Sequence, residues 1–244
     1  MSLMHVSPPG GSSMSLFRKR PCACPGFDRH RSRGSERVEA PAERQMERDR
    51  VEFADLIELA RRLGASDAAM VPAGEIAAED ELARLCLDPP CENYGMSAGC
   101  PPHVAGPSAF RELVGQYEWA LVFRIEVPSQ ILLSDERREV FRLLHEIAAH
   151  VEQAAVRMGH RQSKGYAGGS CKQLFCRGEG ACRVLSEAGA CRNPGQARPS
   201  MSGFGVNVSK LMRTAGWTMN RAGGGTDKDA ASGTGTVCGL VLVG

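Results

Sequence analysis

The chain has 244 residues, of which 42% are hydrophobic and 24% are charged, enough apolar side chains for one or two domains with a sizeable core. Its unbroken apolar runs are far shorter than the roughly 20 residues that span a bilayer, and no apolar segment follows the basic residues at 18–20. These features argue against a membrane protein and a signal peptide, and they predict a cytoplasmic protein.

Positive charge is concentrated at the N-terminal end of the chain. Residues 1–50 carry ten Lys or Arg and six Asp or Glu, whereas the remaining residues carry twenty and twenty-two. The body of the chain therefore lacks the sustained basic stripe that nucleic-acid binding needs. We predict that neither nucleic acid nor a membrane is a partner.

Residues 1–50 are rich in Ser, Pro, Gly and Arg and contain almost no periodic apolar residues. This composition predicts a disordered basic extension, followed by a single cysteine-rich domain over 51–244. Cys22 and Cys24 lie in the extension, where we interpret them as an incidental pair rather than as metal ligands. Translation from Met46 is an alternative, in which case most of the extension would not be made.

Helical and extended patterns alternate beyond residue 50. Apolar residues at helical spacing predict helices over 53–63, 107–117, 134–158 and 208–214, with a shorter helical turn over 78–85. Strands are expected over 68–71, 119–127 and 237–243. The second of these is apolar on both faces at its start, which is typical of a central strand. The predicted fold is α/β or α+β, with a small central sheet covered by helices, and residues 220–236 are expected to form a flexible loop.

Four cysteines lie within twenty-one residues: Cys171, Cys176, Cys182 and Cys191. In a cytosolic chain of this size, clustered thiols bind metal or do redox work more often than they form disulfides. Four thiolates can close a tetrahedral zinc site or hold one iron–sulfur cubane. Structural zinc usually takes two tight pairs of ligands, and only the first pair here fits that rule, so we favour iron–sulfur and keep zinc as the alternative.

A second group consists of Cys86, Cys91 and Cys100, the last of which is followed by Pro101 and Pro102. With three cysteines as ligands, a metal either keeps one open coordination position, as a catalytic metal needs, or takes a fourth ligand from elsewhere in the chain. His103 is the nearest candidate for that ligand, although an ordinary loop histidine is the simpler interpretation. This group is therefore the better place to look for chemistry, whereas the four-cysteine group suits structure or electron relay.

Other polar residues near these groups carry weaker signals. His145 and His150 are five apart on one predicted helix and do not share a face, so we interpret both as solvent or edge histidines. We expect Lys172 and Glu179 to be solvated rather than catalytic. Cys238 lies in the last predicted strand and is most simply a small buried hydrophobe.

Three short motifs contain the clustered cysteines. They are Cys86, Cys91, Tyr94, Gly95 and Cys100–Pro102; Gly168, Gly169 and Cys171; and Cys191, Arg192, Pro194 and Arg198–Met201. Together they resemble an uncharacterised family of predicted metal-binding, cysteine-rich proteins of bacteria and archaea. The resemblance covers roughly residues 50–244, and the Cys-Pro-Pro block is its most specific part. It implies cytosolic metal or iron–sulfur binding, with no settled reaction.

Three functions remain open from the sequence. The first is an iron–sulfur protein with one or two 4Fe–4S clusters, acting in electron transfer or in redox chemistry on a small molecule or a redox protein partner. The second is a zinc protein without catalytic activity, in which the metal only joins loops to the sheet. The third is a metal-handling or cofactor-maturation partner of another enzyme. No general acid or base stands out, so the sequence leaves the catalytic residues, and whether the protein is an enzyme, undecided.

Overall fold

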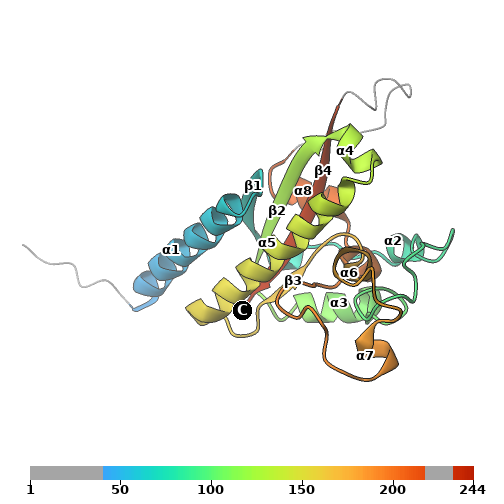
Figure 1. The fold of residues 1–244 in the computed structure, drawn as a ribbon. Coiled ribbons are helices and arrows are strands. Elements are labelled where there is room, and N and C mark those ends of the chain that lie inside the picture. The colour runs from blue at the N-terminus through green and yellow to red at the C-terminus, as the bar shows by residue number, and fades with distance from the viewer. Residues whose placement is uncertain (1–40, 218–232) are drawn as a thin grey trace, which may run out of the picture. The chain divides into compact units, whose positions relative to one another are not determined.

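A four-stranded sheet in the order β1-β2-β4-β3 forms the centre of the computed structural model, which describes residues 41–217 and 233–244 (Figure 1). Every neighbouring pair of strands is antiparallel. The strands are β1 (Asp67–Pro72), β2 (Trp119–Pro128), β3 (Lys164–Tyr166) and β4 (Thr234–Val243). β2 is an inner strand, as its apolar run predicts, and it pairs with β1 on one side and with β4 on the other.

Side chains of the two inner strands point alternately to two separate hydrophobic cores, because successive residues of a strand face opposite sides of a sheet. On β2, Leu121 and Phe123 belong to one core, whereas Ala120 and Val122 belong to the other. The pattern continues on β4. Both faces of the sheet are therefore covered, and the mixed architecture of helices and sheet confirms the predicted fold class.

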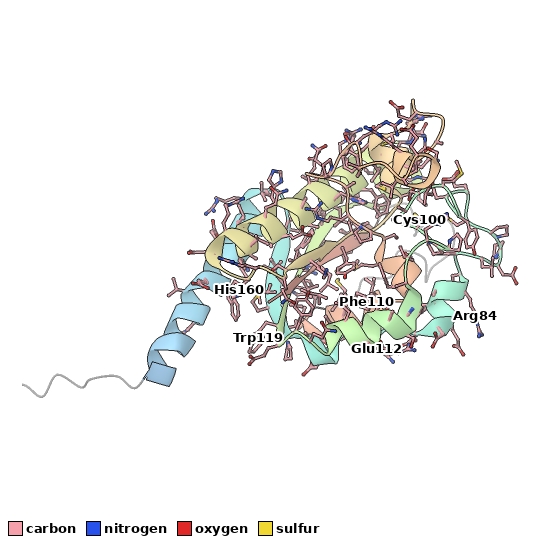
Figure 2. All side chains as sticks on the ribbon, turned by 90° about the horizontal axis from the view of Figure 1, so that it is seen from below. Arg84, Cys100, Phe110, Glu112, Trp119 and His160 are labelled. Carbon is pink, nitrogen blue, oxygen red and sulfur yellow. The ribbon has the colours of Figure 1, made fainter. Side chains whose placement is uncertain are left out.

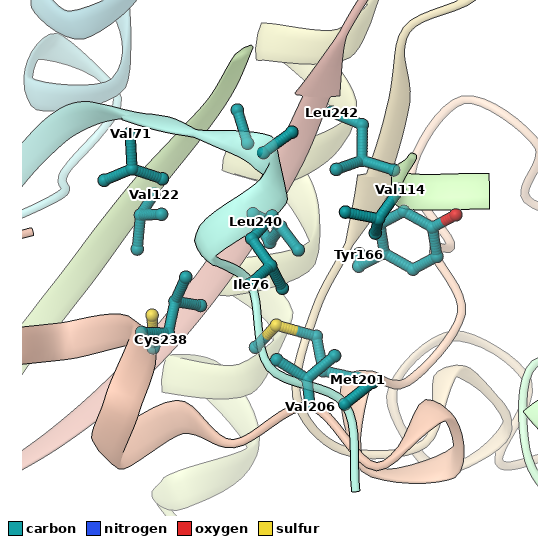
Figure 3. Close-up of a cluster of buried hydrophobic side chains, with 14 of the residues drawn as sticks. Val71, Ile76, Val114, Val122, Tyr166, Met201, Val206, Cys238, Leu240 and Leu242 are labelled. Atoms are coloured by element: carbon teal, nitrogen blue, oxygen red, sulfur yellow. The ribbon is translucent and has the colours of Figure 1, made fainter. Parts of the chain in front are cut away.

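Two long helices cover one face of the sheet and two shorter ones cover the other. α1 (Pro41–Arg62) and α5 (Arg137–Met158) contribute Leu56, Leu144 and Ile147 to the first core. α3 (Gly106–Val114) and α8 (Val208–Thr214) contribute to the second core, whose side chains Figure 3 shows between β4 and the segment around Met201. The sheet is thus the middle of three layers.

Short helices carry the remaining chain. They are α2 (Asp80–Arg84), α4 (Ser129–Leu133), α6 (Cys171–Phe175) and α7 (Arg183–Ser186), with 3-10 turns η1 (Ala73–Glu75) and η2 (Met201–Phe204). Figure 1 shows α2, α3, α6 and α7 at the same end of the fold. That end contains both cysteine groups.

The predicted helices and strands are present, with boundaries that differ by a few residues except at α1. α1 begins at Pro41, before its apolar repeat, so 41–50 are helical rather than part of a disordered extension. The rest of that extension, with Cys22 and Cys24, and most of the loop expected at 220–236 lie outside the described residues. Within the described residues, none of the helices has the length and apolar character needed to span a bilayer.

His145 of α5 fastens the two ends of the segment that carries the four downstream cysteines. Its side chain has no exposed surface. The N–H of Arg198 donates to Nδ1 at 3.0 Å, so Nε2 carries the ring proton and donates to the carbonyl oxygen of Gly168 at 3.0 Å. The pKa of His145 is lowered to about 4, chiefly by burial; the hydrogen bond to Gly168 opposes this effect and the nearby Arg198 charge adds to it. The expectation of a solvent or edge histidine was wrong for His145, whereas His150 is exposed.

Glu152, two turns further along α5, makes a second attachment to the same segment. Its carboxylate accepts from Nε and Nη2 of Arg198 at 2.8 and 3.0 Å, and from the N–H of Gly165 in β3. Gly165 has no room for a side chain, because a Cβ there would lie 2.9 Å from both Glu152 Oε2 and the carbonyl oxygen of Ala148. The Arg198 side chain is buried, so this ion pair is shielded from solvent and geometrically defined.

Lowering the pH should destabilise the protein through His145. In the unfolded state His145 takes up a proton near the ordinary histidine pKa of 6.5, whereas in the folded state it does so only near pH 4. The free energy of unfolding therefore falls as the pH drops between these two values. The expected loss is about 3 kcal/mol at pH 4. Urea unfolding across pH 4–7 should show this slope in the wild type and in His150→Asn, and a shallower slope in His145→Asn. Equal slopes in all three proteins would show that His145 is not the group responsible for the pH dependence.

Replacing Glu152 should be much more damaging than breaking a surface ion pair. Glu152→Gln leaves the buried Arg198 guanidinium without its counter-charge. The expected cost is about 2–3 kcal/mol of unfolding free energy. This is less than the cost of breaking a fully buried ion pair, because Glu152 is partly exposed. The matched control is Asp67→Asn, which breaks the exposed Arg61–Asp67 pair and should cost less than about 1 kcal/mol. Denaturant unfolding of both variants measures the difference, and similar losses would argue against a structural role for the buried pair.

Candidate metal centres

The three upstream cysteines line one cavity of about 470 Å³. Cys86 follows α2, and the loop after it closes on itself through two backbone hydrogen bonds, from Cys91 N–H to the Cys86 carbonyl at 3.1 Å and from Gly95 N–H to the Pro101 carbonyl at 2.7 Å. Gly95 has φ of +75°, a conformation that glycine adopts without steric cost. This closure explains why cysteines fourteen residues apart in sequence reach the same cavity. Figure 2 shows Cys100, at the end of this loop, away from the end of the fold that carries His160.

The four downstream cysteines line a second, much narrower cavity of about 20 Å³. Cys171 is the first residue of α6, Cys176 caps its C-terminal end, Cys182 precedes α7, and Cys191 lies in the loop that follows. The connection between the two helices is fixed by Lys172, whose ammonium group donates to the carbonyl oxygens of Cys176 and Glu179 at 2.7 and 2.5 Å.

Hydrogen-bond donors surround the sulfur atoms of this second cavity. Asn193 donates from its side-chain Nδ2 to Cys176 Sγ at 3.1 Å and from its backbone N–H to Cys191 Sγ at 3.4 Å. Backbone N–H groups also face Cys182, from Ala98, Val184 and Leu185. Such donors stabilise negative charge on sulfur and tune the properties of a bound metal.

The two cavities share a wall. Cys100 Sγ lies 3.5 Å from Ser170 Oγ, and Ser170 immediately precedes Cys171 in the chain. A Cβ on Gly99 would lie 3.6 Å from Cys171 Sγ, and the buried Ser97 hydroxyl lies beside the same sulfur. Residues 97–100 of the upstream loop therefore pack directly against the start of the downstream segment, so the two groups are neighbours although seventy residues separate them in sequence.

Burial and mutual repulsion shape the protonation of these thiols. Burial raises the pKa of Cys171 to about 11, and the charges of Cys100, Cys191 and Cys182 add to this against the hydrogen bond from Ser97. Burial also raises the pKa of Cys86, with contributions from Cys91 and Cys100. Burial acts in the same direction on Cys182, but the surrounding N–H groups and Arg192 outweigh it and lower the pKa. Because a metal binds thiolate, loading these sites must release protons.

The four-cysteine cavity has a feature that suits a bound group. Ser97 is only 1% exposed, lines the four-cysteine cavity, and its hydroxyl finds no hydrogen-bond partner of good geometry among the described residues. A buried hydroxyl without a partner is costly, so a group bound at the thiols would satisfy it. Within 41–217 and 233–244, no three His, Cys, Asp or Glu side chains meet in the arrangement that would hold a single ion directly. The cysteines border cavities instead.

The structure places the other residues named from the sequence as follows. His103 is exposed and is not among the residues that line the three-cysteine cavity, whereas Tyr94 is. Glu179 is exposed and pairs with Arg192 at 3.3 Å. Lys172 is buried, so the expectation of a solvated lysine was wrong. Cys238 is confirmed as a buried core residue, with burial raising its pKa to about 12.

Sequence reasoning missed the polar residues that stand between and around the thiols, namely Asn93, Ser97, Ser170 and Asn193. Each lies within three residues of a cysteine. Their proximity in sequence was the available signal, but serine and asparagine are common in turns for local reasons, so nothing distinguished these four.

Comparison with known proteins gives one match, to a family model. Neither a curated protein nor a solved structure matches this chain. A family model described as predicted metal-binding protein, DUF2284, matches residues 69–243, a range that includes both cysteine groups. The match spans most of the sequence, and the chain therefore belongs to this family of predicted metal-binding proteins.

Proposed function

We propose that the protein holds iron–sulfur clusters at its two cysteine groups and acts in electron transfer or in redox chemistry on a small molecule. The observation that carries the proposal is the shared wall between two cavities lined by cysteine. One cavity has four thiols and the other three, and Ser170 separates Cys100 from Cys171. Two redox centres so placed could exchange electrons.

Iron–sulfur chemistry is favoured over zinc by the arrangement of the four downstream cysteines. They are separated by four, five and eight residues, and the chain winds round a cavity through α6 and α7. The irons of a cubane are spread out, so its ligands approach from several sides, whereas structural zinc usually takes two tight pairs. The N–H groups that face Cys176, Cys182 and Cys191 are of the kind that tune cluster potential.

The two groups differ in what they leave open. Cys171, Cys176, Cys182 and Cys191 would complete the ligand set of one cubane, which suits an electron relay. Cys86, Cys91 and Cys100 would hold a cluster by three ligands and leave one coordination position open beside the cavity of about 470 Å³. When bound there, such a cluster supplies a one-electron carrier with Lewis-acid character. The protein supports it by orienting the thiols through the closed loop at 91–101.

The proposed setting is the cytoplasm, where reducing conditions keep thiols available as ligands. A redox protein partner or a reduced small molecule would supply the electrons. In this arrangement Asn193 holds Cys176 and Cys191 in place, and the Ser97 hydroxyl, which lies beside Cys171, would donate to the bound group.

Metal analysis tests the proposal directly. Protein purified without oxygen should be brown, with absorbance in the visible region and comparable amounts of iron and acid-labile sulfide. The measurement is absorbance together with iron, sulfide and zinc content on the same sample. A colourless protein with stoichiometric zinc would end the iron–sulfur proposal.

Replacing one downstream cysteine should remove one cluster and perturb the other. Cys182→Ser should lower the iron content by about half if each group holds one cubane. Because Cys100 and Cys171 are neighbours, the electron paramagnetic resonance spectrum of the reduced protein should also lose the broadening that two adjacent paramagnets cause. The matched control is Cys238→Ala, which alters a core thiol outside both cavities and should keep all the iron. Full iron retention in Cys182→Ser would show that the cysteines are grouped wrongly.

A further inference from the structure

We propose that the cavity beside Cys86, Cys91 and Cys100 binds a small molecule that carries no negative charge and that has a hydrogen-bond donor and an apolar portion. This names the substrate class of the open site, and it rests on the proposed function only in placing a redox centre at the three thiols. The cavity of about 470 Å³ lies within the size range of small-molecule sites, roughly 300–1,000 Å³.

The lining of this cavity carries no formal charge apart from what its thiols acquire. Hydroxyl and amide side chains alternate with aliphatic ones, and no Lys, Arg, His, Asp or Glu is among them. The lining includes Leu82, Leu85, Asn93, Tyr94, Ser202 and Val208. An anionic substrate would find no cation in this lining, and the thiolates of a loaded site would repel it.

The neighbouring cavity gives a contrast within the same protein. It measures about 920 Å³ and its lining includes Arg137, Arg138, Lys172 and Arg177. Both cavities touch Asn93, Gly169 and Ser170, so they lie on either side of the same short segments. The basic side chains nearby therefore belong to the other cavity, and the lining of the three-cysteine cavity selects against anions.

Asn93 supplies the polar contact for such a ligand. Its side-chain oxygen Oδ1 is buried and has no hydrogen-bond partner among the described residues. A buried acceptor without a donor costs free energy, and a bound N–H or O–H group would recover it. Asn93 lines both this cavity and the neighbouring one, and it stands two residues after Cys91, so a ligand that reaches it from this cavity would lie near the three-cysteine group.

Leu85 and Leu82 supply the apolar contact. Leu85 is 65% exposed although it is a large aliphatic side chain, and it lies at the cavity beside Cys86. An exposed leucine at a cavity bordered by hydroxyls and amides suits a ligand with one apolar end and one polar end. Because Leu85 is exposed, it can be changed without disturbing the core.

Benzamide and benzoate test the proposal, since they share a shape and differ in charge and in the amide N–H. Benzamide should give a saturable change in the visible circular dichroism of the anaerobically purified protein and raise its thermal midpoint, and benzoate at the same concentrations should do neither. Asn93→Leu should weaken benzamide binding about tenfold, the effect of one buried hydrogen bond.

A blocking variant keeps the test independent of Asn93. Leu85→Trp should fill the cavity and abolish the response to benzamide, whereas Leu133→Trp alters a leucine that is 73% exposed on α4, away from this cavity, and should respond as the wild type does. Equal responses to benzamide and benzoate, no response to benzamide, or an undiminished response in Leu85→Trp would each overturn the proposal. Absence of iron would end the proposed function instead, and the thermal midpoint would still decide the cavity proposal because it needs no chromophore.

Discussion

The attachment of one chain segment to helix α5 at two points is the constraint on which both cysteine groups depend. His145 accepts from the Arg198 N–H and donates to the Gly168 carbonyl, and Glu152 holds the Arg198 guanidinium. The segment between Gly168 and Arg198 contains only two short helices and carries all four downstream cysteines. Such a loop has little core of its own, so its shape depends on where its ends are held. The rigid helix supplies those positions.

This dependence extends to the upstream group. The loop that ends in Cys100 packs on the start of the fastened segment, through Gly99 and Ser170. The N–H of Ser200, two residues after Arg198, donates to the Gly99 carbonyl at 2.9 Å. The upstream cysteines are thus positioned against a surface that α5 already fixes, and the two groups form one assembly even though each has its own cavity.

Sequence patterns predicted what depends on periodicity and missed what depends on tertiary contact. The continuous apolar run of β2 and the long apolar stripe of α5 were sufficient to place both elements. β3 has three residues, too few to show a pattern, and it exists because β4 offers an edge to pair with. His145 and Lys172 were expected in solvent because polar residues are usually exposed, yet hydrogen bonds to distant backbone groups allow both to be buried. The cysteine groups were recognisable from their spacing, but nothing local indicated that Cys100 and Cys171 would be neighbours.

Lys172 also bears on how easily a cluster at the neighbouring thiols would accept an electron. Lys172 is 8% exposed, and its ammonium group donates to two carbonyl oxygens, which carry no net charge, so these bonds leave its positive charge uncompensated. Four thiolates make a cubane anionic, and each added electron makes it more so. A fixed cation in a low-dielectric wall opposes that growing repulsion. If the proposed cluster is bound there, the buried lysine would favour its reduced state and raise its reduction potential above what the thiolates alone would set.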